Sequence, residues 1–378
     1  MQIFEQYVSN TCAGSGNQLF FDMPADQTRT SRVFYRKTAG GCFSYALLFS
    51  NIIDSTYADG RVSHRNLILP PWTITQARAG RCAFIPPEKP LDQLMMCDAP
   101  DTPSDIRVDS WQTLTFDGES EKHVEPGAFF STDPFTLCLE AGEYLCVELT
   151  YSGKRLPYHE ESLLPIFTYV SGAWRYDRRM PLPGLVACQR PVKARIGFLG
   201  DSITQGIGVA SNSYLHWNAR LAALLGNDYA YWNLGIGYGR ASDAATDGAW
   251  LYKAKHNDWI VVCYGVNDIQ QGASAQEIER NLATIVRALR QAGVRVVMQT
   301  VPPFDYTGER IRTFEEVNAF IRGELAREVE LVFDVVPLLA RDSAHPYAAR
   351  FGGHPNEAGC ALWAQALCDA LRPLLGAR

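Results

Sequence analysis

The chain has 378 residues, which at about 100–200 residues per domain predicts two domains, each large enough for its own hydrophobic core. Hydrophobic residues make up 47% and charged residues 20%, close to the averages of globular proteins, which excludes a disordered or fibrous chain. The net charge is −6 without a long basic run, and no apolar stretch approaches the ~18 residues that cross a bilayer. We therefore expect neither a nucleic acid nor a membrane as a partner.

The N-terminal sequence and the cysteines indicate the cellular compartment. Residues 1–6 contain neither the basic nor the apolar segment of a secretory signal, so we expect a cytoplasmic protein. The ten cysteines are spread from Cys12 to Cys368, without a Cys-x-x-Cys pair or histidines at zinc spacing. Cys138 and Cys146 lie in apolar runs, where a free cysteine acts as a small hydrophobic residue. We expect reduced core thiols and no metal site.

The first half of the chain has the pattern of a β protein. Short alternating or β-rich runs, such as 43–49 and 145–151, recur between turn residues, and no helix is predicted among them. This pattern predicts an all-β sandwich or jelly roll as an accessory domain over residues 1–190. The proline-bounded stretch 181–191 is the predicted linker.

After residue 190 the pattern changes to strand, loop and helix in repetition. Strand-like runs occur at 196–199, 229–232, 259–263, 294–298 and 331–333. Helical periodicity lies between them, with a capping box of Ser274 and Glu277 before one helix, and a last amphipathic helix runs from about Asn356 toward Leu375. This alternation predicts, over residues 191–378, a doubly wound α/β sheet of about five parallel strands with functional loops at their carboxyl ends.

Four loops of this second domain contain residues suited to acyl transfer. Ser202 stands in Gly-Asp-Ser-Ile-Thr at a strand-to-helix turn, where a nucleophile belongs. The Gly-rich loop 233–240 offers backbone N–H groups to an oxyanion, and Asn267 in Gly-Val-Asn-Asp offers a side-chain amide to the same oxygen. His354, in Gly-His-Pro-Asn-Glu-Ala-Gly, stands at the start of the last helix and is a candidate base.

These four motifs, in this order at strand ends, resemble those of the SGNH hydrolases, also called GDSL-type esterases, over roughly residues 193–378. The resemblance implies a flavodoxin-like three-layer sandwich without metal or organic cofactor. It implies Ser202 as the nucleophile and His354 as the base. It also implies an oxyanion hole formed by the Ser202 N–H, a loop N–H and the Asn267 amide.

The loop donor of the oxyanion hole has two candidates. In the family it lies five residues after the Asn of the Gly-rich block, which corresponds here to Tyr238 between two glycines. Because any residue can supply a backbone N–H, Tyr238 and Gly239 are both candidates for this donor. Asp201, next to the nucleophile, is a candidate supporting residue.

One position departs from the family pattern. The last block usually reads Asp-x-x-His, but Phe351 stands three residues before His354 and cannot orient an imidazole. Residues 342–346 do spell Asp-x-x-His-Pro, which makes His345 a rival base. We favour His354, because only this histidine is followed at once by Pro-Asn-Glu-Ala-Gly and a periodic helix. Its orienting partner would be a backbone carbonyl or Asp342.

The first domain has a second resemblance. Its segments 126–137 and 141–145 are similar to the sandwich that precedes the catalytic domain in two-domain carbohydrate esterases of this group. Together the two resemblances imply a serine esterase that hydrolyses short acyl esters, above all acetyl esters of a small or oligomeric carbohydrate, through an acyl-serine intermediate. The alternatives are a lysophospholipase or thioesterase of the same fold and a catalytically inactive carbohydrate-binding protein. The sequence leaves the oligomeric state open.

Overall fold

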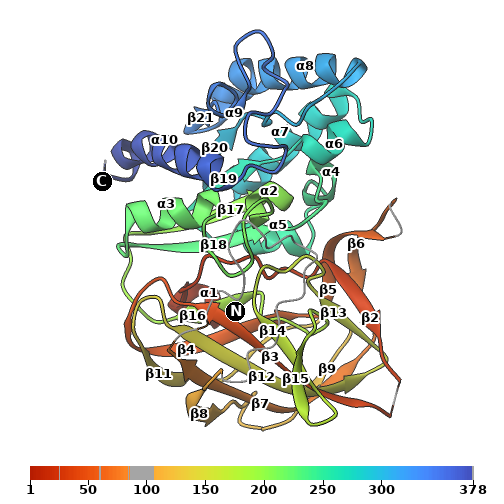
Figure 1. The fold of residues 1–378 in the computed structure, drawn as a ribbon, viewed down its shortest axis with the longest axis vertical. Helices are drawn as coiled ribbons and strands as arrows, with labels where there is room; N and C mark the ends of the chain where they lie inside the picture. Colours follow the sequence, from red (N-terminus) through yellow and green to blue (C-terminus); the bar gives the residue numbers. More distant parts are fainter. Residues whose placement is uncertain (25, 59–60, 84, 86–105, 377–378) are drawn as a thin grey trace. The chain divides into compact units, whose positions relative to one another are not determined.

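The computed structural model of the protein describes residues 1–24, 26–58, 61–83, 85 and 106–376. Its internal contacts divide the chain into two compact units (Figure 1). The first unit comprises Met1–Pro191 and Ala210–Ser213, and the second comprises Val192–Val209 and Tyr214–Arg378.

The first unit consists mainly of antiparallel strands. It contains the helix α1 (Gln2–Gln6) and the strands β1 (Val8–Ser9), β2 (Leu19–Asp22), β3 (Thr28–Arg36), β4 (Gly41–Ser50), β5 (Ile52–Ala58), β6 (Arg61–Ile68), β7 (Trp72–Cys82), β8 (Asp109–Thr113), β9 (Lys122–Val124), β10 (Phe129–Ser131), β11 (Phe135–Leu139), β12 (Tyr144–Gly153), β13 (Arg155–Tyr158), β14 (Ile166–Val170), β15 (Ala173–Tyr176) and β16 (Leu185–Cys188). One large sheet has the order β1-β16-β4-β10, with β11 also on β4. The other has the order β15-β14-β3-β12-β7-β8, with β9 on β7, and two further pairs are β13-β2 and β5-β6. The predicted all-β sandwich is confirmed.

Strand β12 lies at the centre of the larger sheet and is buried on both faces. It pairs with β3 on one side and β7 on the other. Because successive side chains of a strand point to opposite faces, Val147 and Leu149 pack on one face and Cys146 on the other. Cys146 belongs to a buried cluster with Phe34 and Phe167, whose rings meet edge-on at 6.1 Å. The first six residues of β12 are all buried, so both faces of the strand are covered there.

One pair of cysteines differs from the prediction. Cys42 on β4 lies directly opposite Cys138 on β11, both side chains are exposed, and the two form a disulfide. The expectation of reduced core thiols is wrong for this pair, because the register of two strands 96 residues apart cannot be seen in the sequence. The free cysteines among the described residues are all buried, including Cys146.

Two further predictions for the first unit are wrong. The predicted linker contains β16, whose four residues are buried and pair with both β1 and β4. A four-residue apolar run between prolines is too short to show a period, so the sequence pattern missed it. The unit also begins with the helix α1, where no helix was predicted.

The second unit, coloured green to blue in Figure 1, is a parallel α/β sandwich. Its strands are β17 (Ala194–Gly200), β18 (Tyr229–Gly235), β19 (Trp259–Cys263), β20 (Arg295–Gln299) and β21 (Leu331–Phe333). Its helices are α2 (Ser202–Gln205), α3 (Trp217–Leu225), α4 (Ala241–Ala244), α5 (Ala249–Ala254), α6 (Val266–Gln270), α7 (Ala275–Gln291), α8 (Glu309–Gly323), α9 (Val336–Leu339) and α10 (Glu357–Gly376), with a 3-10 turn at Leu325–Glu328. The strand order β18-β17-β19-β20-β21, all parallel, is the flavodoxin-like order. The predicted fold class is confirmed, including all five strands.

Buried aromatic residues hold two of the helices together. Helix α10 lies along α3, and Trp363 stacks on Trp217 with ring centroids 4.8 Å apart. Phe198 of β17 meets Trp217 edge-on at 5.3 Å, which fixes α3 on the sheet. Because α10 follows the loop that carries His354, this packing also fixes the position of that loop.

None of the helices in the described part of the chain combines the length and the hydropathy needed to cross a bilayer.

Candidate active site

The candidate nucleophile lies at the carboxyl edge of the parallel sheet. Ser202 is the first residue of α2 and stands two residues after the end of β17. The side chain of Asp201 caps this short helix, because its Oδ1 accepts the N–H of Ile203 at 3.0 Å. Ser202 is 8% exposed. The cap therefore fixes a nearly buried hydroxyl at the strand-to-helix turn.

The candidate base reaches the serine from the turn before α10. Nε2 of His354 lies 2.8 Å from Oγ of Ser202. The turn is anchored to the last helix by Asn356, whose Oδ1 accepts the N–H of Gly359 at 3.1 Å. The ring of Phe304 packs edge-on against the imidazole at 5.4 Å. The structure thus brings Ser202 and His354 into hydrogen-bond contact.

Two glycines allow the loops around the serine to approach each other closely. A Cβ on Gly208, which has φ +108°, would lie 2.6 Å from the carbonyl oxygen of Pro355. A Cβ on Gly235, at the end of β18, would lie 2.1 Å from the backbone nitrogen of Gln205. Neither position has room for a side chain, so these glycines let the histidine turn and β18 pack against the nucleophile loop.

The environment of His354 favours the neutral imidazole. Burial lowers the pKa of His354 below its usual 6.5. A neutral ring with an unprotonated Nε2 can accept the proton of the Ser202 hydroxyl. Within the described residues no hydrogen bond engages Nδ1 of His354, so no carboxylate completes a triad there.

The structure places Asp342 against the rival histidine. Its Oδ1 lies 2.9 Å from Nδ1 of His345, and both side chains are about half exposed. The hydrogen bond from His345 lowers the pKa of Asp342. Asp342 is therefore not brought to His354, and His345 is not brought to Ser202.

The Gly-rich turn after β18 carries the candidate oxyanion donors. The N–H of Gly239 donates to the carbonyl of Ile236 at 3.1 Å, so this donor is engaged within the turn. The carbonyl of Gly239 accepts from Nδ2 of Asn267 at 3.0 Å, and the amide has a second N–H for another acceptor. Tyr238 has φ +61°, a conformation that usually belongs to glycine. Of the two backbone candidates, the N–H of Gly239 is thus already engaged, and Tyr238 stays a candidate.

Comparison with known protein families gives a match for part of the chain. Residues 198–362 match the model of the GDSL-like lipase/acylhydrolase family. The matched segment includes Ser202, Asn267 and His354, and the match indicates ester hydrolase activity for this domain. Comparison with curated proteins gave no match.

We call the matched region, residues 198–362, the GDSL-like domain. Several solved structures are similar to about half of this chain. A member of the lipolytic protein G-D-S-L family from Veillonella parvula is 19% identical, with 46% of this chain and 96% of that chain covered and a TM-score of 0.39. A carbohydrate esterase family 3 protein from Talaromyces cellulolyticus is 20% identical, with 48% and 98% covered and a TM-score of 0.37. The psychrotrophic esterase EstA from Pseudoalteromonas sp. is 17% identical, with 48% and 98% covered and a TM-score of 0.39.

Buried amides support the nucleophile helix of the GDSL-like domain, and sequence reasoning missed them. Nδ2 of Asn218 donates to the carbonyl of Thr204 at 2.5 Å, and Nδ2 of Asn233 donates to the carbonyl of Gln205 at 3.2 Å. These bonds satisfy carbonyls at the end of the short helix α2. Asn233 begins the Gly-rich loop and could have been found there, whereas Asn218, inside a helix, gives no sequence signal.

A second buried carboxylate, also missed, holds the end of the Gly-rich turn after β18. Asp268 follows Asn267, and its Oδ2 accepts the N–H of Ala241 at 3.0 Å. Burial raises its pKa to about 6, and burial together with the nearby Asp268 raises that of Asp201 to about 7. Asp268 therefore links the Asn267 segment to the residues after the Gly-rich turn, whereas Asp201 bonds within the serine loop.

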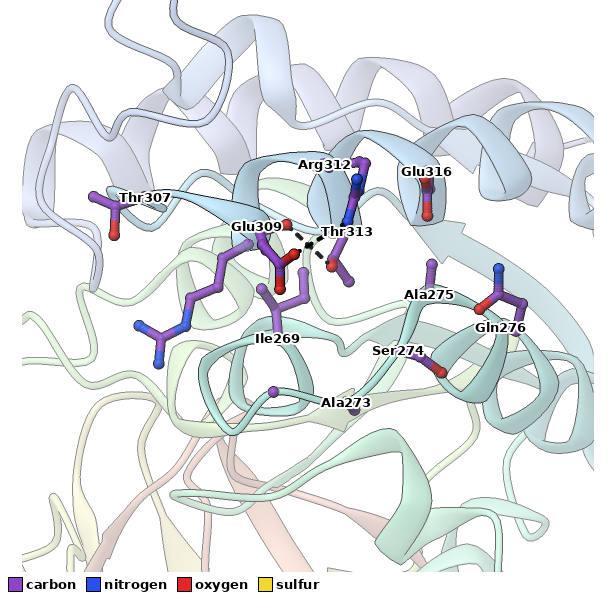
Figure 2. A pocket seen from close by; sticks show the side chains of 12 residues that line it. Ile269, Ala273, Ser274, Ala275, Gln276, Thr307, Glu309, Arg312, Thr313 and Glu316 are labelled. Atoms are coloured by element: carbon purple, nitrogen blue, oxygen red, sulfur yellow. Dashed lines mark hydrogen bonds and ion pairs between the residues drawn. The ribbon is translucent and has the colours of Figure 1, made fainter.

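Figure 2 shows a hollow in the second unit. Its volume is about 660 Å³, and it is lined by residues of α6, the start of α7 and α8, among them Ser274, Arg310 and Glu316. The lining includes neither Ser202 nor His354, so we do not assign the hollow to the catalytic site. In the ranges that the structure describes, no cluster of His, Cys, Asp or Glu is arranged to hold a metal ion.

Proposed function

We propose that this protein is a serine esterase that removes acetyl or other short acyl groups from carbohydrate esters, with Ser202 and His354 as a catalytic dyad. The observation that carries the proposal is the 2.8 Å contact between Oγ of Ser202 and Nε2 of His354. The asparagine amide at the neighbouring turn supports it, because acyl transfer needs donors for the developing oxyanion.

In the first step Oγ of Ser202 attacks the ester carbonyl while its proton passes to Nε2 of His354. The oxyanion accepts hydrogen bonds from the Ser202 and Tyr238 backbone N–H groups and from the Asn267 amide; one such donor contributes about 3 kcal/mol. The tetrahedral intermediate then expels the alcohol, which takes the proton from His354, and leaves an acyl-serine.

In the second step water hydrolyses the acyl-serine. His354 takes a proton from the water, and the hydroxide attacks the acyl carbonyl. Collapse of this intermediate releases the carboxylic acid and returns the proton to Ser202. With no carboxylate on Nδ1, the imidazolium has the oxyanion of the intermediate as its nearest countercharge.

The carbohydrate part of the proposal rests on the resemblance of the 126–145 region to the sandwich of two-domain carbohydrate esterases. The substrate would then be an acyl ester of a small or oligomeric carbohydrate. Short acyl groups fit this assignment, since acetyl is a common ester substituent of sugars.

A series of p-nitrophenyl esters from acetate to octanoate, with wild-type protein and Ser202→Ala, tests the proposal. We expect acetate to give the highest kcat/KM and Ser202→Ala to lower kcat at least ~10³-fold, because only binding and oxyanion effects remain without the nucleophile. Retained activity in Ser202→Ala would contradict the nucleophile assignment. A higher kcat/KM on octanoate would favour a lysophospholipase or thioesterase, and an inactive wild type would favour a carbohydrate-binding protein.

A further inference from the structure

The imidazole of His354 is held by a hydrogen bond on one side only. Its Nε2 lies 2.8 Å from Oγ of Ser202, whereas none of the described residues forms a hydrogen bond with its Nδ1. Phe351 stands where the family pattern has a carboxylate, and Asp342 is engaged by His345. A base that takes the proton of a serine hydroxyl needs a fixed ring orientation. A group other than a carboxylate must therefore orient this ring.

The side chain of Phe304 packs against the imidazole of His354. The ring centroids are 5.4 Å apart and the ring planes form an angle of 81°, which is an edge-to-face contact. The same ring covers the preceding residue, because a Cβ added to Gly353 would lie 2.9 Å from both Cδ2 and Cε2 of Phe304 and 3.2 Å from its Cγ. Three ring atoms at nearly the same distance indicate that Gly353 faces the flat side of the ring. Phe304 thus contacts both the imidazole and the backbone that carries it.

The loop that carries Phe304 is held in place on both sides of this residue. Before it, Val301 donates its backbone N–H to Oδ1 of Asn318 on α8 at 2.7 Å, and its carbonyl accepts from Nδ2 at 3.1 Å. The next two residues are prolines, whose rings fix the backbone angle φ. After it, the buried hydroxyl of Tyr306 donates to the carbonyl of Pro302 at 3.3 Å. The backbone on either side of Phe304 is therefore anchored.

This loop is also bonded to the segment that precedes the candidate base. Oδ1 of Asp305 accepts the N–H of Ala349 at 3.0 Å. The N–H of Tyr306 donates to the carbonyl of Tyr347 at 3.4 Å. Both bonds start at residues directly after Phe304 and end a few residues before the histidine. They fix the position of the phenyl ring relative to the imidazole.

We propose that Phe304 is a positioning residue that holds the imidazole of His354 toward Ser202, in place of the carboxylate of a triad. The inference rests on the proposed function and adds to it the group that orients the base. Rotation of the imidazole about its Cβ–Cγ bond would move Nε2 away from the serine hydroxyl. The phenyl ring resists this rotation, because the two rings are already in contact.

The test is a double-mutant cycle with p-nitrophenyl acetate as the substrate. We expect Phe304→Ala to lower kcat at least ~20-fold and to change KM less than ~3-fold, because a displaced base slows the chemical step without weakening binding. In the His354→Ala protein the same substitution is expected to change kcat less than ~2-fold, because no imidazole remains to be oriented.

Two more variants complete this experiment. Phe304→Leu retains an apolar side chain without a flat ring and is expected to lower kcat at least ~5-fold, with the same dependence on His354, which provides the test if Phe304→Ala does not fold. Phe320→Ala truncates another half-buried phenylalanine, on α8, and is the matched control that leaves kcat unchanged.

The outcomes separate this inference from the proposed function. Equal losses of kcat in the wild-type and His354→Ala backgrounds, or no loss in either, would overturn the positioning role and leave the esterase assignment standing. A wild type that hydrolyses no ester would refute the proposed function. The positioning role is then decided by NMR: we expect a nuclear Overhauser contact between the imidazole of His354 and Hβ of Ser202 that is lost in Phe304→Ala. A contact present in both proteins, or in neither, overturns the inference.

Discussion

The buried carboxyl group of Asp201 makes the stability of the GDSL-like domain depend on pH. Asp201 is 1% exposed; its Oδ1 accepts one backbone N–H, while its Oδ2 is buried without a hydrogen-bond partner. Burial, and secondarily the nearby Asp268, raise its pKa from the ordinary 3.8 to about 7. Between these pH values the folded protein holds a proton that the unfolded chain has already released.

The size of the effect follows from this difference. The pKa of Asp201 rises from 3.8 in the unfolded chain to about 7 in the folded protein. Each factor of ten in the ionisation constant is worth about 1.4 kcal/mol, so the rise corresponds to about 4 kcal/mol of folding stability. Because the folded-state pKa is the higher one, this stability is fully present below pH 4 and is lost as the pH rises through about 7. Asp201→Asn cannot ionise and therefore does not show this loss.

The assay is urea unfolding of wild-type protein and Asp201→Asn at intervals between pH 4 and pH 8, followed by tryptophan fluorescence. We expect the wild type to lose about 4 kcal/mol relative to the variant across this range. Asp342→Asn serves as a control without a pH trend in this range, because the pKa of Asp342 is lowered from 3.8 and its contribution is lost only as the pH falls below about 4. The argument would be refuted if the free energy of unfolding of the wild type, relative to that of Asp201→Asn, stayed constant or rose as the pH increased.

Two further predictions concern the histidines. His354→Ala is expected to lower kcat about as much as Ser202→Ala, whereas His345→Ala and Asp342→Asn should each change kcat less than ~3-fold; the opposite ranking in steady-state kinetics would make His345 the base. The acid limb of the pH profile of kcat/KM is expected to have its midpoint below 6.5, because burial lowers the pKa of His354 and the base must be neutral. A midpoint above 6.5 in buffers of constant ionic strength would contradict this.

The parallel sheet could be predicted from the sequence because its strands are continuous apolar runs. A strand buried on both faces, such as β19 (Trp259–Cys263), needs apolar residues at every position. This run of apolar residues can be recognised in the sequence even when the neighbouring strands are unknown. The loops at Ser202, at the Gly-rich turn and at Asn267 could be found for the same reason, since each stands at the end of such a strand, whereas the His354 loop precedes the helix α10. The capping of α7 by Ser274, whose Oγ accepts the N–H of Glu277 at 3.3 Å, is likewise a local pattern.

Features that depend on distant pairing could not be predicted. The opposition of Cys42 and Cys138 follows from the register of β4 and β11, which no local pattern encodes. The sequence also left open whether Asp342 reaches His354. The structure pairs it with His345, because a three-residue spacing lets the carboxylate accept the backbone N–H of His345 and contact its ring in one turn.

The assignment of Ala210–Ser213 to the first unit limits how the two units can be exchanged. The N–H of Asn212 donates to the carbonyl of Leu163 at 2.8 Å, and both residues belong to the first unit. Along the chain this segment stands between the nucleophile helix and α3, so a recombination event at residue 191 would separate Asn212 from its acceptor. The two units are therefore not independent modules in the genetic sense. Replacing the first unit would therefore also require replacing residues 210–213.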